Sequence, residues 1–465
     1  MTISTPIDPS TRIYRTVNPA TGDILHEWPQ MTDDEAGVAL DRAHDAFLSW
    51  RATPVARKVG LFHAAADAID ARADDLAHQV TLEMGKPLVQ STMEVGSVTQ
   101  MFRYYADHGE ELLADEHVAI PGVSRAVTRR EPVGVLLGIE PWNAPLYQAM
   151  RAAVPNLMLG NTVLLKPSEI TAGSTLMLDE ILLGAGFPAD VYQTSLLSTT
   201  QVSTLIADPR VRALTLTGSD RAGSAVGEQA GKHIKPVVLE LGGSDAFIVL
   251  DSADVEQAAA VAANVRLFYS GQVCVSPKRV IITDKVADRF IAEYAKIFAN
   301  QTVGDPFDAA TTIGPLSSTT AAGLVQDQLQ DAVDKGATVL VPGGQFDKDS
   351  AFFTPAVVSE LTPDMRLYYE EAFGPIGIIF RVKDATAAVE LANDSKYGLG
   401  GTVYGETAEA EEVARQLDTG TVGINTYYGA PVEAPFGGTK ASGFGRELGR
   451  AGMDNFANIK TYAIA

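Results

Sequence analysis

An alternation of short apolar runs with longer helical patterns constrains this chain more than any other feature. The apolar run Val133–Ile139 is followed by the helical pattern Leu146–Leu159 and by the apolar run Thr162–Lys166. Such runs are typical of strands buried on both faces of a parallel sheet, with helices as the crossover connections. The alternation continues to Pro236–Leu241 and begins again at Phe247–Leu250. We therefore predict an α/β fold made of two successive α/β series.

Other segments of the chain do not follow this alternation. Apolar spacing predicts three helices, over 32–50, from Thr53-Pro54 to Met84, and from about Val89 to Leu113. Segment 117–131 places a Pro121-Gly122 pair between apolar residues, which predicts a β-hairpin. The glycine-rich segment 435–449 predicts a loop that approaches another group closely.

Length and charge narrow the classes of function. A chain of 465 residues suggests about two to four domains. There are 58 Asp and Glu residues against 36 Lys and Arg, which gives a formal net charge of −22. A surface this acidic repels phosphate backbones and anionic lipid, so we expect no nucleic-acid partner and no membrane partner.

Cysteine and histidine usage points to a reducing compartment. Cys274 is the single cysteine, so no disulfide forms within the chain, and we expect a cytoplasmic protein. All seven histidines lie at or before His233, and we expect no metal site. Met1 to Trp28 is polar and lacks the apolar core of a signal peptide.

One segment could bind phosphate. The dinucleotide fingerprint G-x-G-x-x-G is absent, because the start at Gly443 fails at Leu448. Gly218, Ser219 and Gly223 instead lie between a predicted strand and a predicted helix. A helix N-terminus of this composition offers free N–H groups to an anion, although an ordinary strand–helix turn has the same composition.

Three side chains suit nucleophilic catalysis. Cys274 lies in a Gly-Gln-Val-Cys turn, where a thiolate could act as nucleophile or a thiol could be a small buried hydrophobe. Glu240 ends an apolar strand, which suits a desolvated general base or a salt bridge to a neighbouring domain. Asn143 follows the first strand of the series, where its amide could donate to an oxyanion or form a turn.

Two further polar patches accompany these residues. Lys166-Pro167-Ser168-Glu169 closes a predicted strand and could contact ribose hydroxyls or form a surface ion pair. Glu370-Glu371-Ala372-Phe373 places two acids before an aromatic residue and could also be a solvated loop.

Together, in this order, these patches resemble the aldehyde dehydrogenase superfamily. The resemblance runs from Asn18-Pro19-Ala20-Thr21-Gly22 to the segment Gly437–Gly443. It implies an NAD-binding domain with a parallel sheet, an α/β catalytic domain and a β-hairpin oligomerisation arm. The implied ranges are 1–113 with 133–242 for cofactor binding, 243–449 for catalysis, and 114–132 with 450–465 for the arm. The arm implies a homodimer or homotetramer.

The resemblance assigns catalytic roles by motif. Cys274 matches the nucleophile that forms a thiohemiacetal and then a thioester, and Asn143 matches the oxyanion donor. Glu240 matches the base that activates the deacylating water. Oxidation of an aldehyde to a carboxylic acid by this route needs no histidine, which suits a second half that has none.

The resemblance also implies a cofactor site. Lys166 and Glu169 match contacts to the adenosine ribose, Ser219 matches a pyrophosphate contact, and Glu371 matches the ligand of the nicotinamide ribose. The remaining implied cofactor residues are Trp142, Ser168, Gly218, Gly223, Leu241 and Phe373. A carboxylate at Glu169 accepts a hydrogen bond from the 2′-hydroxyl and repels a 2′-phosphate, so we expect NAD in preference to NADP.

The substrate side resembles the succinate-semialdehyde dehydrogenase branch. That branch shares Gly-Gly-Ser-Asp, Gly-Gln-Val-Cys and an arginine eight residues after the oxyanion Asn, which is Arg151 here. An arginine is a natural clamp for a distal carboxylate, although Arg151 could instead form a structural ion pair. The other implied substrate residues are Tyr147, Phe268, Tyr269, Val273, Val275 and Phe436.

Departures from the family pattern leave the substrate open. Ala144 stands where a Phe is usual, Tyr269 where an Asn is common, and Phe268 where some members carry a second arginine. An aromatic wall that also includes Tyr427 would suit a medium-chain or aromatic aldehyde equally well. A cofactor-independent thiol hydrolase is the alternative of another class.

Overall fold

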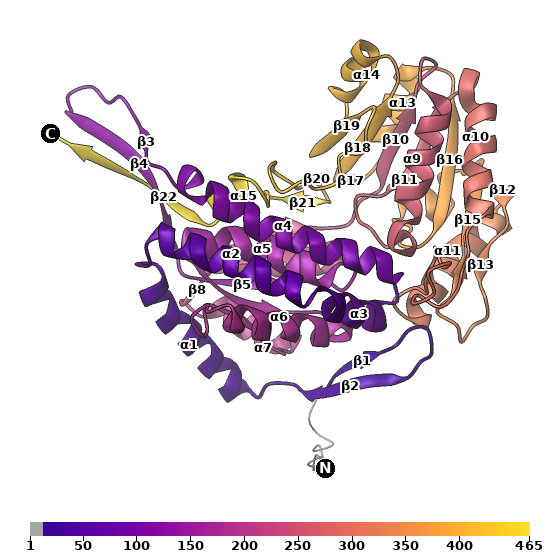
Figure 1. The fold of residues 1–465 in the computed structure, drawn as a ribbon. Helices are drawn as coiled ribbons and strands as arrows, with labels where there is room; N and C mark the ends of the chain where they lie inside the picture. The colour runs from indigo at the N-terminus through magenta and orange to yellow at the C-terminus, as the bar shows by residue number, and fades with distance from the viewer. Residues whose placement is uncertain (1–12) are drawn as a thin grey trace.

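The computed structural model describes residues 13–465, and two sheets form its two main bodies (Figure 1). The first sheet has the strand order β21-β9-β8-β5-β6-β7. Strands β5 to β9 are parallel, and β21 joins the edge of β9 in the antiparallel direction. The strands are β5 (Val135–Ile139), β6 (Thr162–Lys166), β7 (Tyr192–Thr194), β8 (Val211–Thr217), β9 (Val237–Glu240) and β21 (Gly443–Phe444).

Helices cover both faces of the first sheet, as parallel strands require. One face packs on α1 (Asp33–Trp50), α7 (Thr199–Ala207) and α8 (Asp220–Lys232). The opposite face packs on a bundle of α2 (Val55–Ala71), α3 (Ala73–Met84), α4 (Leu88–Leu112), α5 (Pro145–Leu159) and α6 (Ala172–Gly184). Helix α5 is buried over nearly its whole length, so its side chains lie between the sheet and the bundle.

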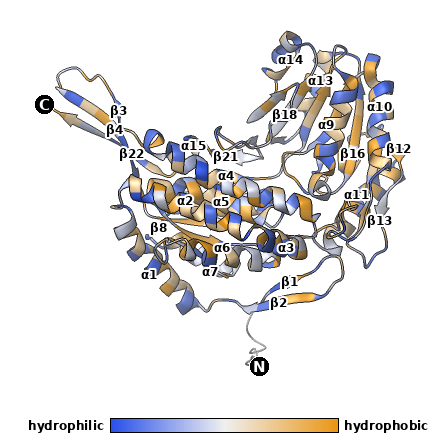
Figure 2. Cartoon of the chain, viewed as in Figure 1, coloured by the Kyte–Doolittle hydropathy of each residue, from blue (hydrophilic) through white to orange (hydrophobic). Residues whose placement is uncertain are grey.

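The second sheet has the order β12-β15-β16-β11-β10-β18-β19 and is parallel except for the β12–β15 pair. Its strands are β10 (Asp245–Val249), β11 (Pro277–Thr283), β12 (Thr338–Val341), β15 (Ala356–Ser359), β16 (Ile376–Val382), β18 (Gly400–Tyr404) and β19 (Thr421–Ile424). Its helices are α9 (Val255–Leu267) and α10 (Asp284–Ala299) on one face, and α11 (Thr319–Asp334), α13 (Ala385–Asn393) and α14 (Thr407–Ala414) on the other. Figure 2 shows apolar strands flanked by helices with hydrophilic outer faces.

A third sheet projects from the body as an arm (Figure 1). It has the order β22-β4-β3, with β3 (Glu116–His117), β4 (Arg125–Pro132) and β22 (Ala457–Ile464). The hairpin predicted around Pro121-Gly122 is confirmed, because β3 and β4 pair in the antiparallel direction. The C-terminal strand β22 pairs along the full length of β4.

Short elements complete the described chain. They are β1 (Ile13–Val17), β2 (Ile24–Pro29), β13 (Gly344–Gln345), β14 (Phe353–Thr354), β17 (Tyr397–Gly398), β20 (Thr439–Lys440), α12 (Arg366–Tyr369), α15 (Ala451–Asp454) and 3₁₀ turns at Glu169–Thr171 and Phe268–Gly271. Within residues 13–465, every helix is too short or too polar to cross a membrane. The absence of a signal peptide was predicted from Met1 to Trp28, and residues 1–12 of that segment lie outside this range.

Two expectations about the N-terminal region need correction. The helix predicted from Thr53 to Met84 is two helices, because Arg72 has φ −115° and ψ 16° and interrupts the hydrogen-bond series between α2 and α3. The β1–β2 hairpin was not predicted. It turns through a segment in which Gly22 has a positive φ of 80°.

Candidate active site

The site lies between the two main sheets, where Cys274 separates two cavities. One cavity has a volume of about 450 Å³ and the other about 290 Å³. Asn143, Gln148 and Cys274 line both cavities. A compound in either cavity would therefore meet the same thiol and the same two amides.

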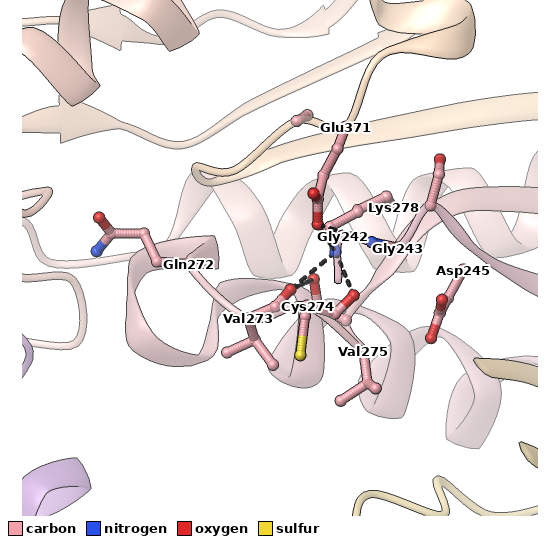
Figure 3. A network of polar contacts seen from close by, with 12 residues as sticks. Gly242, Gly243, Asp245, Gln272, Val273, Cys274, Val275, Lys278 and Glu371 are labelled. Carbon is pink, nitrogen blue, oxygen red and sulfur yellow. Dashed lines mark hydrogen bonds and ion pairs between the residues drawn. The ribbon is translucent and has the colours of Figure 1, made fainter. Parts of the chain in front are cut away.

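The loop that carries Cys274 is held from behind by Lys278. The Lys278 ammonium donates to the carbonyls of Val273 at 2.8 Å and Cys274 at 2.5 Å, and it forms an ion pair with Glu371 at 2.8 Å. Figure 3 shows the Cys274 sulfur on the opposite side of the loop from these contacts. The loop backbone is therefore fixed while the thiol stays free to face the cavities.

Backbone strain precedes this loop. Tyr269, Ser270 and Gly271 all have positive φ values, of 52°, 54° and 78°. The first two are unusual for residues with side chains, and their surroundings hold them there. Gln90 accepts from the Tyr269 N–H at 2.8 Å, and the Ser270 hydroxyl donates to the Gly314 carbonyl at 2.9 Å.

The buried guanidinium of Arg266 braces the same region. It donates to the carbonyls of Gly271, Ala372, Gly374 and Ile376 and to the Ser276 hydroxyl. The loop of the thiol and the loop of Glu371 are thereby tied to one side chain. Several hydrogen bonds to the same short segment keep a strained turn in one conformation.

Cys274 is a thiol at neutral pH in this environment. Burial raises its pKa to about 11, while the positive charges of Lys278 and Arg151 oppose that rise. A nucleophilic thiolate therefore requires a base to remove the proton. The Asn143 amide donates to the Gln272 carbonyl at 3.0 Å, which holds it beside the nucleophile loop.

The position of Asn143 is fixed by a buried ion pair. The Glu94 carboxylate accepts the N–H groups of Leu146 and Tyr147 at the start of α5, at 2.8 and 2.9 Å. The same carboxylate pairs with Lys86, whose ammonium also donates to the Asn143 carbonyl at 3.2 Å. The pair thus caps α5 and anchors Asn143, which lies two residues before the helix begins.

The larger cavity collects the residues expected to contact substrate. Arg151 and six apolar or aromatic residues line it together. The six are Tyr147, Phe268, Tyr269, Val273, Val275 and Phe436. Tyr427 adds to the aromatic wall. Among its described lining residues, Arg151 is the one with a positive charge.

Arg151 is already engaged. It is only 2% exposed, it forms an ion pair with Glu447, and it donates to the Thr217 hydroxyl at 3.1 Å. Its guanidinium also lies 4.7 Å from the centre of the Phe436 ring. Arg151 therefore forms a structural ion pair and also lines the cavity, so both interpretations of this residue from the sequence hold.

The smaller cavity collects six of the expected cofactor residues. They are Trp142, Gly218, Ser219, Leu241, Glu371 and Phe373. The other four lie outside its lining. Lys166 ends β6, Ser168 and Glu169 follow it, and Gly223 lies in the first turns of α8.

The lining of the smaller cavity fits a dinucleotide. Ser219 caps α8 through a hydrogen bond from the Ala222 N–H at 3.3 Å, so the helix N-terminus opens toward the cavity and suits phosphate. The Glu371 carboxylate suits ribose hydroxyls, and it accepts the Gly243 N–H at 3.2 Å. A Cβ at Gly242 would lie 2.4 Å from the same carboxylate, so a larger residue there would displace the Glu371 side chain.

Glu240 lies behind the two cavities. It is 2% exposed, and a Cβ at Gly437 would lie 2.5 Å from its carboxylate. Burial raises its pKa well above the ordinary value, Glu447 adds to the rise, and Arg151 and Arg446 oppose it. In this rotamer the carboxylate is not part of either cavity lining.

Several site residues were not singled out from the sequence. They are Lys86, Glu94, Gln148, Arg266, Lys278 and Glu447. Gln148 could have been noticed, since it is a polar residue within the otherwise apolar start of a predicted helix. The charged residues gave no such signal, because a lone Lys, Arg or Glu in a sequence usually lies on the surface.

Comparison with known proteins agrees with this geometry. The sequence model of the aldehyde dehydrogenase family matches residues 7–462. A succinate-semialdehyde dehydrogenase [NADP(+)] of Deinococcus radiodurans is 44% identical over 97% of this chain and 94% of that protein. A Mycobacterium bovis protein of the same name, numbered 1, is 42% identical over 97% and 99%.

Solved structures of other proteins share the fold of this chain along nearly its whole length. A succinic semialdehyde dehydrogenase from Streptococcus pyogenes, in complex with NADP+, has a TM-score of 0.94 and 39% identity over 97% of this chain and 99% of its own. A salicylaldehyde dehydrogenase from Pseudomonas putida, complexed with salicylaldehyde, has a TM-score of 0.93 and 31% identity over 97% and 94%. Because these matches span nearly the whole chain, the protein belongs to the aldehyde dehydrogenase family and is an oxidoreductase.

Proposed function

We propose that the physiological reaction is oxidation of succinate semialdehyde to succinate. The observation that carries this proposal is Arg151, the one cationic residue among the described residues that line a mostly apolar cavity. A substrate with a carboxylate at the far end from its aldehyde would place that carboxylate at Arg151 and its carbonyl carbon at Cys274. Two relatives and a structural neighbour are named for this substrate, which supports the same choice.

We assign the chemical steps to three side chains. The Cys274 thiol loses its proton to water, the thiolate attacks the aldehyde carbon, and the oxyanion that forms accepts hydrogen bonds from the Asn143 amide and the Cys274 N–H. Collapse of this thiohemiacetal expels a hydride and leaves a thioester. Bound NAD(P)+ supplies the hydride acceptor. Glu240 turns toward the thioester and removes a proton from water, which releases the acid and the thiolate.

Cofactor preference rests on Lys166, Ser168 and Glu169. The Glu169 side chain is exposed at the end of β6, and Lys166 is half-buried beside it. Because an exposed carboxylate can turn away, we propose that the chain accepts NADP+ as well as NAD+, in keeping with its relatives' names. A preference for NAD+, expected from repulsion of the 2′-phosphate by Glu169, stays a prediction.

We also propose the division of the chain into a cofactor-binding part, a catalytic part and an arm, and a cytoplasmic location for the protein. The two sheets support a cofactor-binding part and a catalytic part, although β21 belongs to the first sheet while its residues fall within 243–449. The projecting arm supports a homodimer or homotetramer. The single cysteine supports a cytoplasmic location.

A second candidate substrate is a medium-chain or aromatic aldehyde. The stacked rings of Phe268 and Tyr269, with centres 4.2 Å apart, form an aromatic part of the cavity wall. The similarity to a salicylaldehyde dehydrogenase supports this candidate. An aldehyde of this class would use the same three catalytic side chains and would not need Arg151.

Arg151 substitution separates the two candidates. R151M alone would leave Glu447 buried without its charge partner, so the double variant R151M/E447Q is the better probe. We expect it to raise KM for succinate semialdehyde by about 10- to 100-fold, the value of a charge-assisted hydrogen bond. KM for benzaldehyde should change little, and E447Q alone is the control. Equal changes for both aldehydes would contradict the proposed substrate.

A further inference from the structure

The N-terminal strand β1 supplies an aromatic ring to the expected adenosine end of the cofactor site. This strand lies against the 3₁₀ turn Glu169–Thr171, which follows the carboxyl end of β6. Tyr14 of β1 is 1% exposed, and the Lys166 ammonium lies over its ring, 5.4 Å from the ring centre. At this distance the electrons of the ring face attract a cation. Tyr14 therefore contacts a residue expected to bind ribose, although the two lie far apart in the sequence.

The Tyr14 ring is itself held in place. Its hydroxyl donates to the Leu197 carbonyl at 2.6 Å. The ring packs in a small apolar cluster with Ala172, the first residue of α6, and with Leu196, which follows β7. The ring is thus a fixed part of the first body, and it can hold a more flexible side chain that lies against it.

The Lys166 side chain is the flexible partner in this contact. It is half-buried, and its ammonium donates to the Pro167 carbonyl at 2.8 Å. The charge of the Glu169 carboxylate also reaches it and opposes the effect of burial on its pKa. A lysine has a long stem with several rotatable bonds, so its ordering by a ligand costs free energy. An ammonium that the protein has already placed loses less freedom when the ligand binds.

We propose that Tyr14 is a positioning residue for the cofactor, whose ring holds the Lys166 ammonium where the adenosine ribose binds. Lys166 makes the contact with the cofactor, and Tyr14 acts only through Lys166. The β1–β2 hairpin, which belongs to neither main sheet, thereby takes part in cofactor binding. The inference rests on the cofactor role proposed for Lys166.

The test is the Kd of NADP+ for the full chain, measured by isothermal titration calorimetry without aldehyde. Y14L removes the ring, and we expect it to raise the Kd about 3- to 10-fold, because one long side chain must then be ordered on binding. Y14M fills more of the space and should behave in the same way, so it serves where Y14L is unstable. Y14F keeps the ring and loses only the hydrogen bond to Leu197, so its Kd should stay near that of the wild type. A Kd raised as much in Y14F as in Y14L would overturn the inference.

A fragment of the cofactor locates the effect. 2′,5′-ADP carries the adenosine ribose but no nicotinamide, so Y14L should weaken its binding by the same factor as that of NADP+. A Kd for 2′,5′-ADP that Y14L leaves unchanged would place the effect away from the adenosine end and would count against the proposal.

A double-mutant cycle separates this role from a general loss of packing. K166M should raise the Kd of NADP+, and Y14L added to K166M should raise it no further, because the group that the ring positions is already gone. A second rise of the same size would show that Tyr14 does not act through Lys166. If K166M binds NADP+ as tightly as the wild type does, the role proposed for Lys166 is wrong, whatever the result for Tyr14 alone.

The arm offers a matched control. The Lys460 ammonium lies 5.0 Å from the centre of the Tyr462 ring, and both residues belong to β22. Y462L removes a ring from a similar pair away from the cofactor site, so the Kd of NADP+ should not change. A rise in Y462L equal to that in Y14L would show that the effect is not specific to Tyr14.

Discussion

At the level of single residues, sequence motifs predicted the three side chains to which we assign the chemistry, but not the groups that hold them. Cys274, Asn143 and Glu240 follow predicted helix or strand ends, and such ends meet where parallel sheets place ligands. Lys278 and Arg266 are buried and contact groups far along the chain, which are the Glu371 carboxylate for Lys278 and the Gly374 carbonyl for Arg266. Neither property is local, so no pattern near these residues predicts them.

The Cys274 thiol should titrate far above neutral pH. With a pKa of about 11, alkylation by iodoacetamide should accelerate about tenfold per pH unit from pH 7 toward that value. K278M removes a positive charge that lowers this pKa, so the thiolate fraction at any given pH should fall and alkylation should slow. Stopped-time alkylation followed by mass spectrometry measures both effects.

K383M, which removes an exposed lysine, is the matched control and should leave the alkylation rate unchanged. Faster alkylation in K278M than in the wild type would show that Lys278 does not act on the thiol through its charge.

At the scale of elements, strand and helix types were predicted well and their boundaries less well. Apolar runs predicted β5, β6 and β8, because parallel strands that are buried on both faces carry apolar side chains at nearly every position. The break at Arg72 was missed, because the apolar spacing continues through it. The cap of α5 was also missed, because its acceptor, Glu94, is 52 residues from Leu146 in the sequence.

That cap gives a prediction about α5. E94Q leaves the Lys86 ammonium buried without its partner and weakens the acceptor at the helix N-terminus. We expect a loss of about 3–5 kcal/mol in the free energy of unfolding and a lower kcat, because Asn143 is anchored by the same pair. Urea unfolding and steady-state kinetics measure the two quantities.

The surface pair Arg72–Asp75 supplies the comparison for E94Q. D75N should cost about 1 kcal/mol or less and leave kcat unchanged. A similar small cost for E94Q would mean that the buried pair does not hold α5.

At the level of the whole molecule, the projecting arm exposes apolar side chains that no other part of the described chain covers. It carries exposed apolar side chains, Val118, Ile120, Ile459 and Ile464, away from both main bodies. Strand β22 is an edge strand of eight residues, and long apolar edges invite pairing with another chain. The sequence predicted the hairpin from a local turn, but β22 joins it through a contact between distant segments.

Removal of residues 457–465 should therefore convert an oligomer to a monomer. Light scattering of the full chain should give two or four times the mass of one chain, and the truncated chain should give the mass of one. I459K/I464K, which keeps the strand but charges its apolar residues, should weaken assembly in the same direction. An unchanged mass after truncation would place the interface elsewhere.

We propose that the protein oxidises an aldehyde that is bound covalently to Cys274, with a bound nicotinamide cofactor as the hydride acceptor. The most direct test follows NAD(P)H absorbance in the first turnover, with succinate semialdehyde and either NAD+ or NADP+, for the wild type, C274A and E240Q. We expect a burst with steady turnover in the wild type, a burst without turnover in E240Q, and no signal in C274A. A burst in C274A equal to that of the wild type would show that Cys274 is not the nucleophile.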